Sequence, residues 1–138
     1  MFSKHSDHWK TPKDLYHLFI DQGFVDPCPL YCETDNLNKD FGEVNLFINP
    51  PYSDIRSWVK FAIKHHQKYK TKIVLLVPAR TDTKWFHELL DYGIYITFIK
   101  GRLKFGDEKN SAPFPSLLIE IVGDSRQWTN NAEIKEVI

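Results

Sequence analysis

Two proline-rich segments that end apolar runs, called proline-rich stops below, constrain this chain more than any other feature of its sequence. Asp26-Pro-Cys-Pro29 and Asn49-Pro-Pro-Tyr52 each follow a short apolar run, Phe24-Val25 and residues 44–48. Proline removes a backbone N–H and fixes φ, so neither a helix nor an internal strand continues through these segments. We therefore expect two strands that end there and open into rigid loops.

Strand-like and helix-like segments alternate along the rest of the chain, which favours an α/β fold. Helices are expected at about 12–21 with Thr11 as cap, from Ser53 onwards, and after a cap within residues 81–83. Further strands are expected at 73–77, 94–98 and 117–122, and the continuous apolar run 73–77 predicts the centre of a parallel sheet. In such a sheet, ligands bind beyond the carboxyl ends of the strands, where both proline-rich stops fall.

The size of the chain predicts one domain. Its 138 residues and 16.3 kDa suit a single core over residues 1–138, with a polar peripheral tail at 123–138. A hydrophobic content of 42% excludes global disorder. No apolar run has the length of a membrane span or a signal peptide, so we expect a soluble intracellular protein.

Charge is balanced overall but not locally. The chain has 18 basic and 18 acidic residues. Residues 26–43 hold five acids and one base, whereas residues 54–72 hold six bases and one acid. Solvated helix and loop faces explain most such runs. The basic segment is also a candidate electrostatic footprint for nucleic acid.

The cysteines and histidines do not indicate a metal or a disulfide framework. Cys28 and Cys32 form one C-x3-C pair with no second pair. The six histidines show none of the spacings that are typical of zinc ligands. We therefore expect no metal cofactor.

The segment Asn49-Pro-Pro-Tyr52 has the chemistry to bind a planar amino group. Two prolines leave rigid carbonyl acceptors, and the Asn49 amide adds another. Two acceptors on the hydrogens of an exocyclic amine localise its lone pair and make the nitrogen a better nucleophile. The ring of Tyr52 offers a face on which a base can stack.

Six segments in order resemble the phage-type DNA N6-adenine methyltransferase (Dam) family over about residues 6–122. They are Trp9-Lys-Thr-Pro12, Asp26-Pro-Cys-Pro29, Asn49-Pro-Pro-Tyr52, Pro78-Ala-Arg-Thr-Asp-Thr83, Gly101-Arg-Leu-Lys-Phe-Gly106 and Ser111-Ala-Pro-Phe-Pro-Ser116. The resemblance implies a Rossmann-like methyltransferase sheet of about five main strands, mostly parallel, flanked by helices. It also implies S-adenosylmethionine as methyl donor, DNA adenine as acceptor, and a cytoplasmic location in a bacterium or a phage-infected cell.

The resemblance also assigns roles residue by residue. The catalytic set is Asn49, Pro50, Pro51 and Tyr52. The cofactor set is Trp9, Thr11, Pro12, Asp26, Pro27, Cys28, Asp40 and Phe41. The predicted DNA-binding set, Arg80, Arg102 and Lys104, does not come from the resemblance: two of these residues follow strands on the ligand side, where phosphate contacts are needed, and ordinary surface charge is the alternative.

The chain departs from the wider methyltransferase pattern in its cofactor half. A glycine-rich loop is absent after the first strand, and about 20 residues separate Asp26 from Asn49, fewer than a βαβ unit needs. We expect an abbreviated cofactor half and no separate target-recognition domain; an oligomer is not indicated. Alternative functions are methylation of RNA adenine, of DNA cytosine N4 or of a protein glutamine amide. A further alternative is a DNA-binding relative without catalysis.

Overall fold

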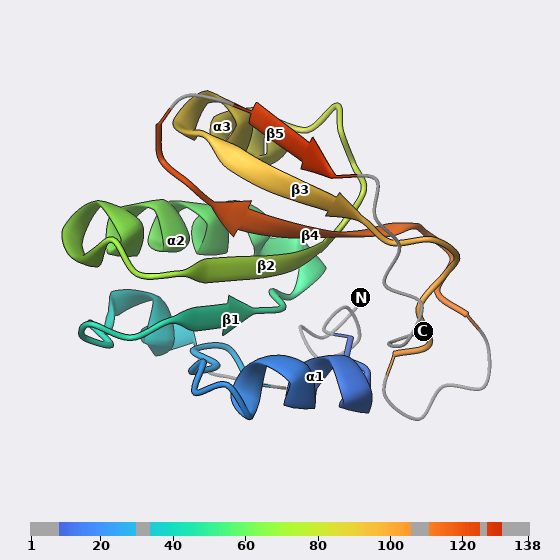
Figure 1. Ribbon diagram of the computed structural model, residues 1–138, viewed down its shortest axis with the longest axis horizontal. Coiled ribbons are helices and arrows are strands. Elements are labelled where there is room, and N and C mark those ends of the chain that lie inside the picture. Colours follow the sequence, from blue (N-terminus) through green and yellow to red (C-terminus); the bar gives the residue numbers. More distant parts are fainter. Residues whose placement is uncertain (1–8, 30–33, 106–110, 125–126, 131–138) are drawn as a thin grey trace.

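The computed structural model describes residues 9–29, 34–105, 111–124 and 127–130, and its strands form one mixed sheet (Figure 1). The strands are β1 (Leu46–Ile48), β2 (Ile73–Pro78), β3 (Ile94–Phe98), β4 (Ser116–Ile121) and β5 (Gln127–Asn130), in the order β1-β2-β4-β3-β5. β1 is parallel to β2, and β3 is parallel to β5, while β4 lies antiparallel between β2 and β3. Four of these five strands therefore run in one direction, which confirms the expected α/β fold with mostly parallel strands.

Helices cover both faces of this sheet. α2 (Ile55–Tyr69) and α3 (Lys84–Tyr92) lie side by side on one face, and α1 (Lys13–Ile20) lies on the other (Figure 1). Two short 3-10 helices, η1 (Thr34–Asn38) and η2 (Tyr52–Asp54), flank β1 in the sequence. β1-α2-β2 and β2-α3-β3 are thus strand-helix-strand units of the kind that the alternating sequence pattern predicted.

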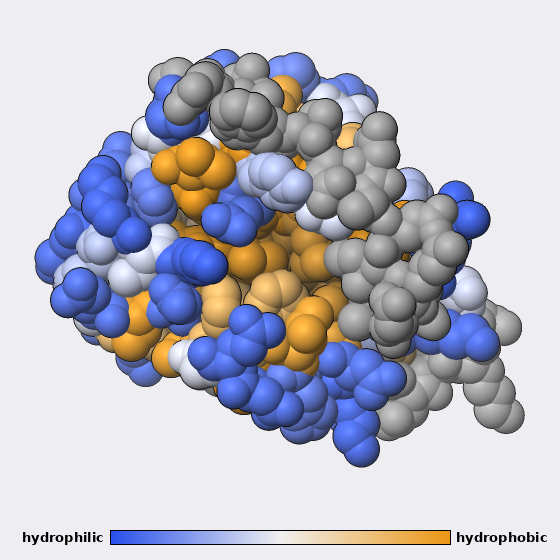
Figure 2. Space-filling view, viewed as in Figure 1, coloured by the Kyte–Doolittle hydropathy of each residue, from blue (hydrophilic) through white to orange (hydrophobic). Residues whose placement is uncertain are grey.

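Alternating strand residues build two apolar clusters, one on each face of the sheet. Leu46, Leu75 and Ile119 pack in the cluster under α2 and α3, whereas Phe47 and Leu76 pack in the cluster that contains Leu15 of α1. β2 is buried along its whole length and pairs on both sides, but the central strand is β4, which is antiparallel to β2, so the prediction that 73–77 is the centre of a parallel sheet is wrong. On the face that carries α1, hydrophobic side chains gather in a hollow bordered by hydrophilic ones (Figure 2).

The helix starts differ from the expected caps in two of three cases. Thr83 caps α3 as predicted, because its side chain accepts a hydrogen bond from Phe86 N. Pro12, not Thr11, precedes α1, and α2 begins after η2, so Ser53 is not its cap. Thr11 fails as a cap because its hydroxyl bonds to the side chain of Asn49, in a distant part of the sequence.

Three strand features also differ from the sequence expectations. The direction of β4 is not encoded in its apolar pattern, because parallel and antiparallel buried strands have similar composition. Residues 127–130 lie in the expected polar tail, yet they form the edge strand β5 beside β3. The run Phe24-Val25 contributes only a single parallel bridge, from Val25 to Leu46.

The direction of β1, β2 and β3 gives the sheet two distinct ends. The carboxyl end is where these three strands finish, and the amino end is where they begin. Cys32 and the tail after residue 130 lie outside the described residues. Within the described part of the chain, no helix is long and apolar enough to cross a membrane.

Candidate active site

Asn49 lies at the carboxyl end of the sheet, directly after its first strand, β1. Its side chain is 4% exposed. Its Nδ2 donates hydrogen bonds to Trp9 O at 2.5 Å and to Thr11 Oγ1 at 2.9 Å. These two contacts fix the amide plane, and with it the direction of the Oδ1 acceptor. The sequence placed Asn49, Trp9 and Thr11 in one site, and the fold brings the three together.

An aromatic cluster of Trp9, Tyr52, Phe105 and Phe114 includes Trp9, whose backbone oxygen binds this amide. The Trp9 ring stacks on Tyr52 at 6.3 Å between centroids and meets the edges of Phe105 and Phe114 at 5.7 Å each. Tyr52 also meets Phe114 at 5.1 Å. Burial raises the pKa of the Tyr52 hydroxyl and the charge of Arg80 opposes the rise, so the hydroxyl stays protonated and can donate.

Asp26 directly follows Val25, which forms a parallel bridge with Leu46, so Asp26 lies toward the same carboxyl end of the sheet. Burial raises the pKa of its carboxyl to about 6, against the hydrogen bonds from Cys28 N and the Tyr16 hydroxyl that favour the charged form. The Cys28 bond measures 2.9 Å, and the Cys28 side chain is buried. Asn36 Nδ2 donates to Pro27 O at 3.0 Å, which ties this proline-rich loop to η1. Asp26 is thus a carboxylate that is ionised at neutral pH and partly shielded from water.

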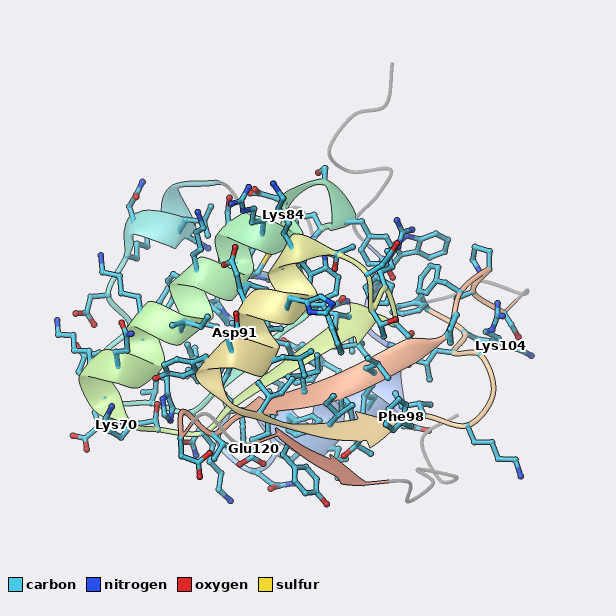
Figure 3. The ribbon with its side chains drawn as sticks, turned by 90° about the horizontal axis from the view of Figure 1, so that it is seen from above. Lys70, Lys84, Asp91, Phe98, Lys104 and Glu120 are labelled. Carbon is cyan, nitrogen blue, oxygen red and sulfur yellow. The ribbon has the colours of Figure 1, made fainter. Side chains whose placement is uncertain are left out.

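The three cations predicted to contact DNA lie on loops that follow β2 and β3. Arg80 comes two residues after the end of β2, and its charge acts on Tyr52. Arg102 and Lys104 lie in the loop after β3, where Arg102 donates to Ala112 O at 3.5 Å. Figure 3 shows Lys104 beyond the same end of β3 as Phe98. All three are exposed at the carboxyl end of the sheet. Their contact with DNA stays a prediction.

Asp40 and Phe41 lie elsewhere. Asp40 forms an ion pair with Lys68 and accepts hydrogen bonds from the Tyr69 hydroxyl at 2.5 Å and from Gly42 N at 2.8 Å. Lys68 and Tyr69 belong to the last turn of α2, at the amino end of the sheet. Phe41 packs against Phe61 in the apolar core. The fold therefore does not bring these two residues to Asn49, and their predicted cofactor role has no support from this placement.

Several residues of the site were not singled out from the sequence. Phe105 and Phe114 lie in segments that carry the family resemblance, and this was the signal that could have found them. Tyr16 reaches Asp26 from the inner side of α1, which helical spacing alone does not indicate. Ser116, at the start of β4, is 2% exposed, and its hydroxyl has no hydrogen-bond partner among the residues described.

The donor set suits an organic cation better than a metal ion. No group of three or more potential metal ligands occurs among the described residues. Aromatic faces and a shielded carboxylate attract a sulfonium or ammonium group. Trp9 and Tyr52 provide aromatic faces, and Asp26 provides a shielded carboxylate, at the carboxyl end of the sheet.

Comparison with known proteins agrees with this chemistry. The family model described as DNA N-6-adenine-methyltransferase (Dam) matches residues 1–135. A search among curated proteins gave no match. One similar solved structure is a predicted O-methyltransferase, protein Atu636 from Agrobacterium tumefaciens, with 16% identity and a TM-score of 0.40. That match covers 66% of this chain and 42% of the other, so the chain spans less than half of that protein, and the low TM-score carries no argument here.

Proposed function

Because the chain belongs to the DNA N-6-adenine-methyltransferase (Dam) family, we propose that it transfers a methyl group from S-adenosylmethionine to the N6 atom of adenine in DNA. The observation that carries this proposal is the Asn49 amide, buried directly after β1 and held on its Nδ2 side by Trp9 O and Thr11 Oγ1. An amide fixed in this way presents its Oδ1 acceptor in one direction without reorganising during the reaction.

The residues of the Asn49 loop have different roles toward the N6 amino group of adenine. Asn49 Oδ1 and the carbonyl of Pro50 accept the two N6 hydrogens, and Pro51 keeps the loop rigid. The bound cofactor supplies an electrophilic methyl group on sulfur. Orientation and hydrogen bonds to the amine then account for most of the rate, and the N6 proton leaves to water.

A duplex adenine must leave its stack to reach this loop. Flipping the nucleotide costs a few kcal/mol. The protonated Tyr52 and the rest of the aromatic cluster supply stacking surfaces at the position where the base arrives. We assign Arg80, Arg102 and Lys104, which are exposed on loops at the carboxyl end of the sheet, to the phosphates of the strand.

Asp26 and Trp9 are the residues that we assign to the cofactor. The Asp26 carboxylate would accept hydrogen bonds from the ammonium group of the methionine end, and Thr11, Pro12, Pro27 and Cys28 shape the two segments around it. Trp9 offers an aromatic face to positive charge. Charge removal in Asp26→Asn is therefore expected to weaken S-adenosylmethionine binding in calorimetry.

The test is methyl transfer to DNA that lacks methylated adenine. The protein is incubated with methyl-labelled S-adenosylmethionine and DNA, and the DNA is digested to nucleosides. We expect N6-methyladenine, and a loss of at least about 100-fold in rate for Asn49→Ala. Asn45→Ala is the matched control, because Asn45 directly precedes β1 and Asn49 directly follows it. Folded protein without N6-methyladenine, or an Asn49→Ala variant at full rate, contradicts the proposal.

The same protein and cofactor also test the alternative methyl acceptors and the alternative of a non-catalytic role. RNA adenine, cytosine N4 and a glutamine amide are offered in place of DNA adenine; a faster reaction with one of them replaces the proposed substrate. Titration with S-adenosylmethionine or its demethylated product separates an enzyme from a DNA-binding relative. Saturable binding that depends on Asp26 and Trp9 supports the enzyme.

A further inference from the structure

A cavity of about 250 Å³ lies along α2, on the side that faces η1 and residues 37–40. One wall consists of the rings of Phe61, His65 and Tyr69, which follow each other at a spacing of four residues. Phe61 and His65 are stacked at 6.4 Å, and His65 and Tyr69 lie 4.9 Å apart. We call this space the α2 cavity. It lies over the last three turns of the helix, away from the Asn49 loop at the helix start.

The charges around the α2 cavity favour an anion. Lys39, Lys64 and Lys68 line it and are exposed, and Asp40 is the acid among the lining residues. Asp40 is already bound by Lys68, the Tyr69 hydroxyl and Gly42 N, and these contacts hold the pKa of its carboxyl well below the usual range. Lys39 and Lys64 therefore keep their charge uncompensated within the described residues, where neither forms an ion pair.

Aromatic rings next to lysines are a combination that binds nucleotides in proteins. Aromatic rings stack on bases of any sequence, and lysines bind the phosphates as point charges. The volume is just below the range for a drug-sized ligand, so it suits one nucleotide and not a longer stretch of chain. His65 is 6% exposed and bonds to Val44 O and Thr71 Oγ1 at 3.2 Å each, so it supports the wall while Phe61 and Tyr69 offer more exposed faces.

We propose that the α2 cavity binds a single nucleotide unit, with its base against Phe61 and Tyr69 and its phosphate between Lys39 and Lys64. The unit is either a free nucleotide or one residue of a nucleic-acid strand, because both present the same base and phosphate. This site is separate from the Asn49 loop and does not depend on methyl transfer.

Residue-resolved NMR of the full chain tests this site. Deoxyadenosine monophosphate, deoxyadenosine, inorganic phosphate and a short single-stranded oligonucleotide are titrated while backbone amides are followed. We expect the monophosphate to shift the amides of Lys64, His65 and Tyr69, and to bind at least about tenfold tighter than deoxyadenosine or phosphate alone. Tighter binding of the oligonucleotide at these amides identifies a strand as the source, and equal binding identifies a free nucleotide.

Charge variants give effects of opposite sign. Lys39→Gln with Lys64→Gln should weaken the monophosphate at least about tenfold, whereas Asp40→Asn should strengthen its binding. The matched control is Lys70→Gln with Lys72→Gln, which removes equal charge at the same end of the sheet but outside the cavity lining; it should change affinity less than about twofold. Circular dichroism confirms that each variant is folded.

Three results overturn the proposal. They are equal losses in the two double variants, shifts confined to other parts of the chain, and phosphate binding as tightly as the monophosphate. S-adenosylmethionine carries an adenosine without a phosphate, and we expect it to leave these amides in place. If it shifts them as strongly as the monophosphate does, the cavity is a cofactor site instead. Methyl transfer can fail or succeed independently of all these outcomes.

Discussion

Two aspartates at opposite ends of the sheet show how differently this small fold uses the same side chain. Asp26, at the carboxyl end, is partly buried, and burial raises the pKa of its carboxyl to about 6. Asp40, at the amino end, lies at the surface, where Lys68 and two hydrogen-bond donors lower the pKa of its carboxyl. The charged form of Asp26 opposes folding, whereas the charged form of Asp40 favours it. The charge of Asp26 therefore has an energetic cost at a candidate binding site, whereas the charge of Asp40 has none.

The largest expected effect concerns Asp26 and pH. Between about pH 4 and 6 the unfolded chain releases the proton while the folded protein keeps it, so the stability contributed by the protonated form is lost as pH rises through this window. The difference amounts to about 3 kcal/mol. Asp26→Asn should remove this loss and unfold at higher urea than the wild type at pH 7.5, but not at pH 4.

An exposed acid on α3 provides the control. Asp91→Asn should keep the pH dependence of the wild type, since Asp91, labelled on α3 in Figure 3, is exposed to solvent. If the free energy of unfolding changes with pH in the same way for the wild type and Asp26→Asn, the charged form of Asp26 does not destabilise the fold. The contrast between Asp26 and Asp40 would then be wrong.

The next effect comes from a packed contact at the amino end. An added Cβ at Gly123, whose φ is +81°, would lie 2.7 Å from His66 Cε1 and 3.1 Å from Tyr92 Cε2, beside the 2.6 Å hydrogen bond between those side chains. Gly123→Ala should cost about 2.5 kcal/mol from backbone strain and overpacking together. Gly42→Ala has a similar φ of +80° but open space around it, and should show the strain alone.

Urea denaturation of both glycine variants measures the difference. Equal losses would mean that the His66 and Tyr92 rings move aside freely. The amino end would then contain no tight packing at this point, and its stability would rest on surface charge to a larger extent than we infer.

A smaller effect is expected for the hydrogen bonds of Asn49. In Asn49→Asp, a carboxylate oxygen replaces Nδ2 and faces Trp9 O, which can only accept. We expect a loss of about 2 kcal/mol in the free energy of unfolding. In the control Asn45→Asp, the oxygen that accepts from Lys72 N at 2.9 Å is retained, so little change is expected. Equal losses in the two variants would exclude the donor role of Nδ2.

The smallest effect is expected for Asp40→Asn. Its ion pair with Lys68 joins two largely exposed side chains, and such pairs add little stability. Because the pKa of Asp40 is lowered, the contribution is present at neutral pH and is lost as pH falls below about 4. The difference from the wild type in thermal unfolding should shrink as salt is raised from ~0.05 M to ~1 M. A loss that does not respond to salt would contradict a surface electrostatic role.

The sequence predicted local features better than long-range ones. Helical spacing predicts one apolar face for α2, formed by Ile55, Trp58, Val59, Ala62 and Ile63; the first four are buried, and Ile63 is half-buried. Strand 94–98 was predicted with the bounds that the structure has. These features depend on neighbours within one or two turns, so periodicity is sufficient to find them.

The sequence did not predict which polar side chains bond to residues that are distant in the sequence. Thr11 looked like a helix cap because Pro12 follows it, but its hydroxyl accepts from Asn49 Nδ2, 38 positions away. Asp40 was predicted to contact the cofactor from its place in the order of motifs; the structure bonds it to Lys68 and Tyr69, and its cofactor role stays a prediction. In both cases a polar side chain has several possible hydrogen-bond partners, and the tertiary structure determines which of them lies within reach.

The antiparallel direction of β4 has a consequence for how this site is made during synthesis. Because β4 begins at the carboxyl end of the sheet, the segment before it delivers Phe114 to Trp9, which stands near the start of the chain. A growing polypeptide therefore has the Asn49 loop long before it has the complete aromatic cluster. The aromatic cluster is complete only when β4 has paired with β2, so a chain interrupted before that step would carry the Asn49 loop without Phe114 against Trp9.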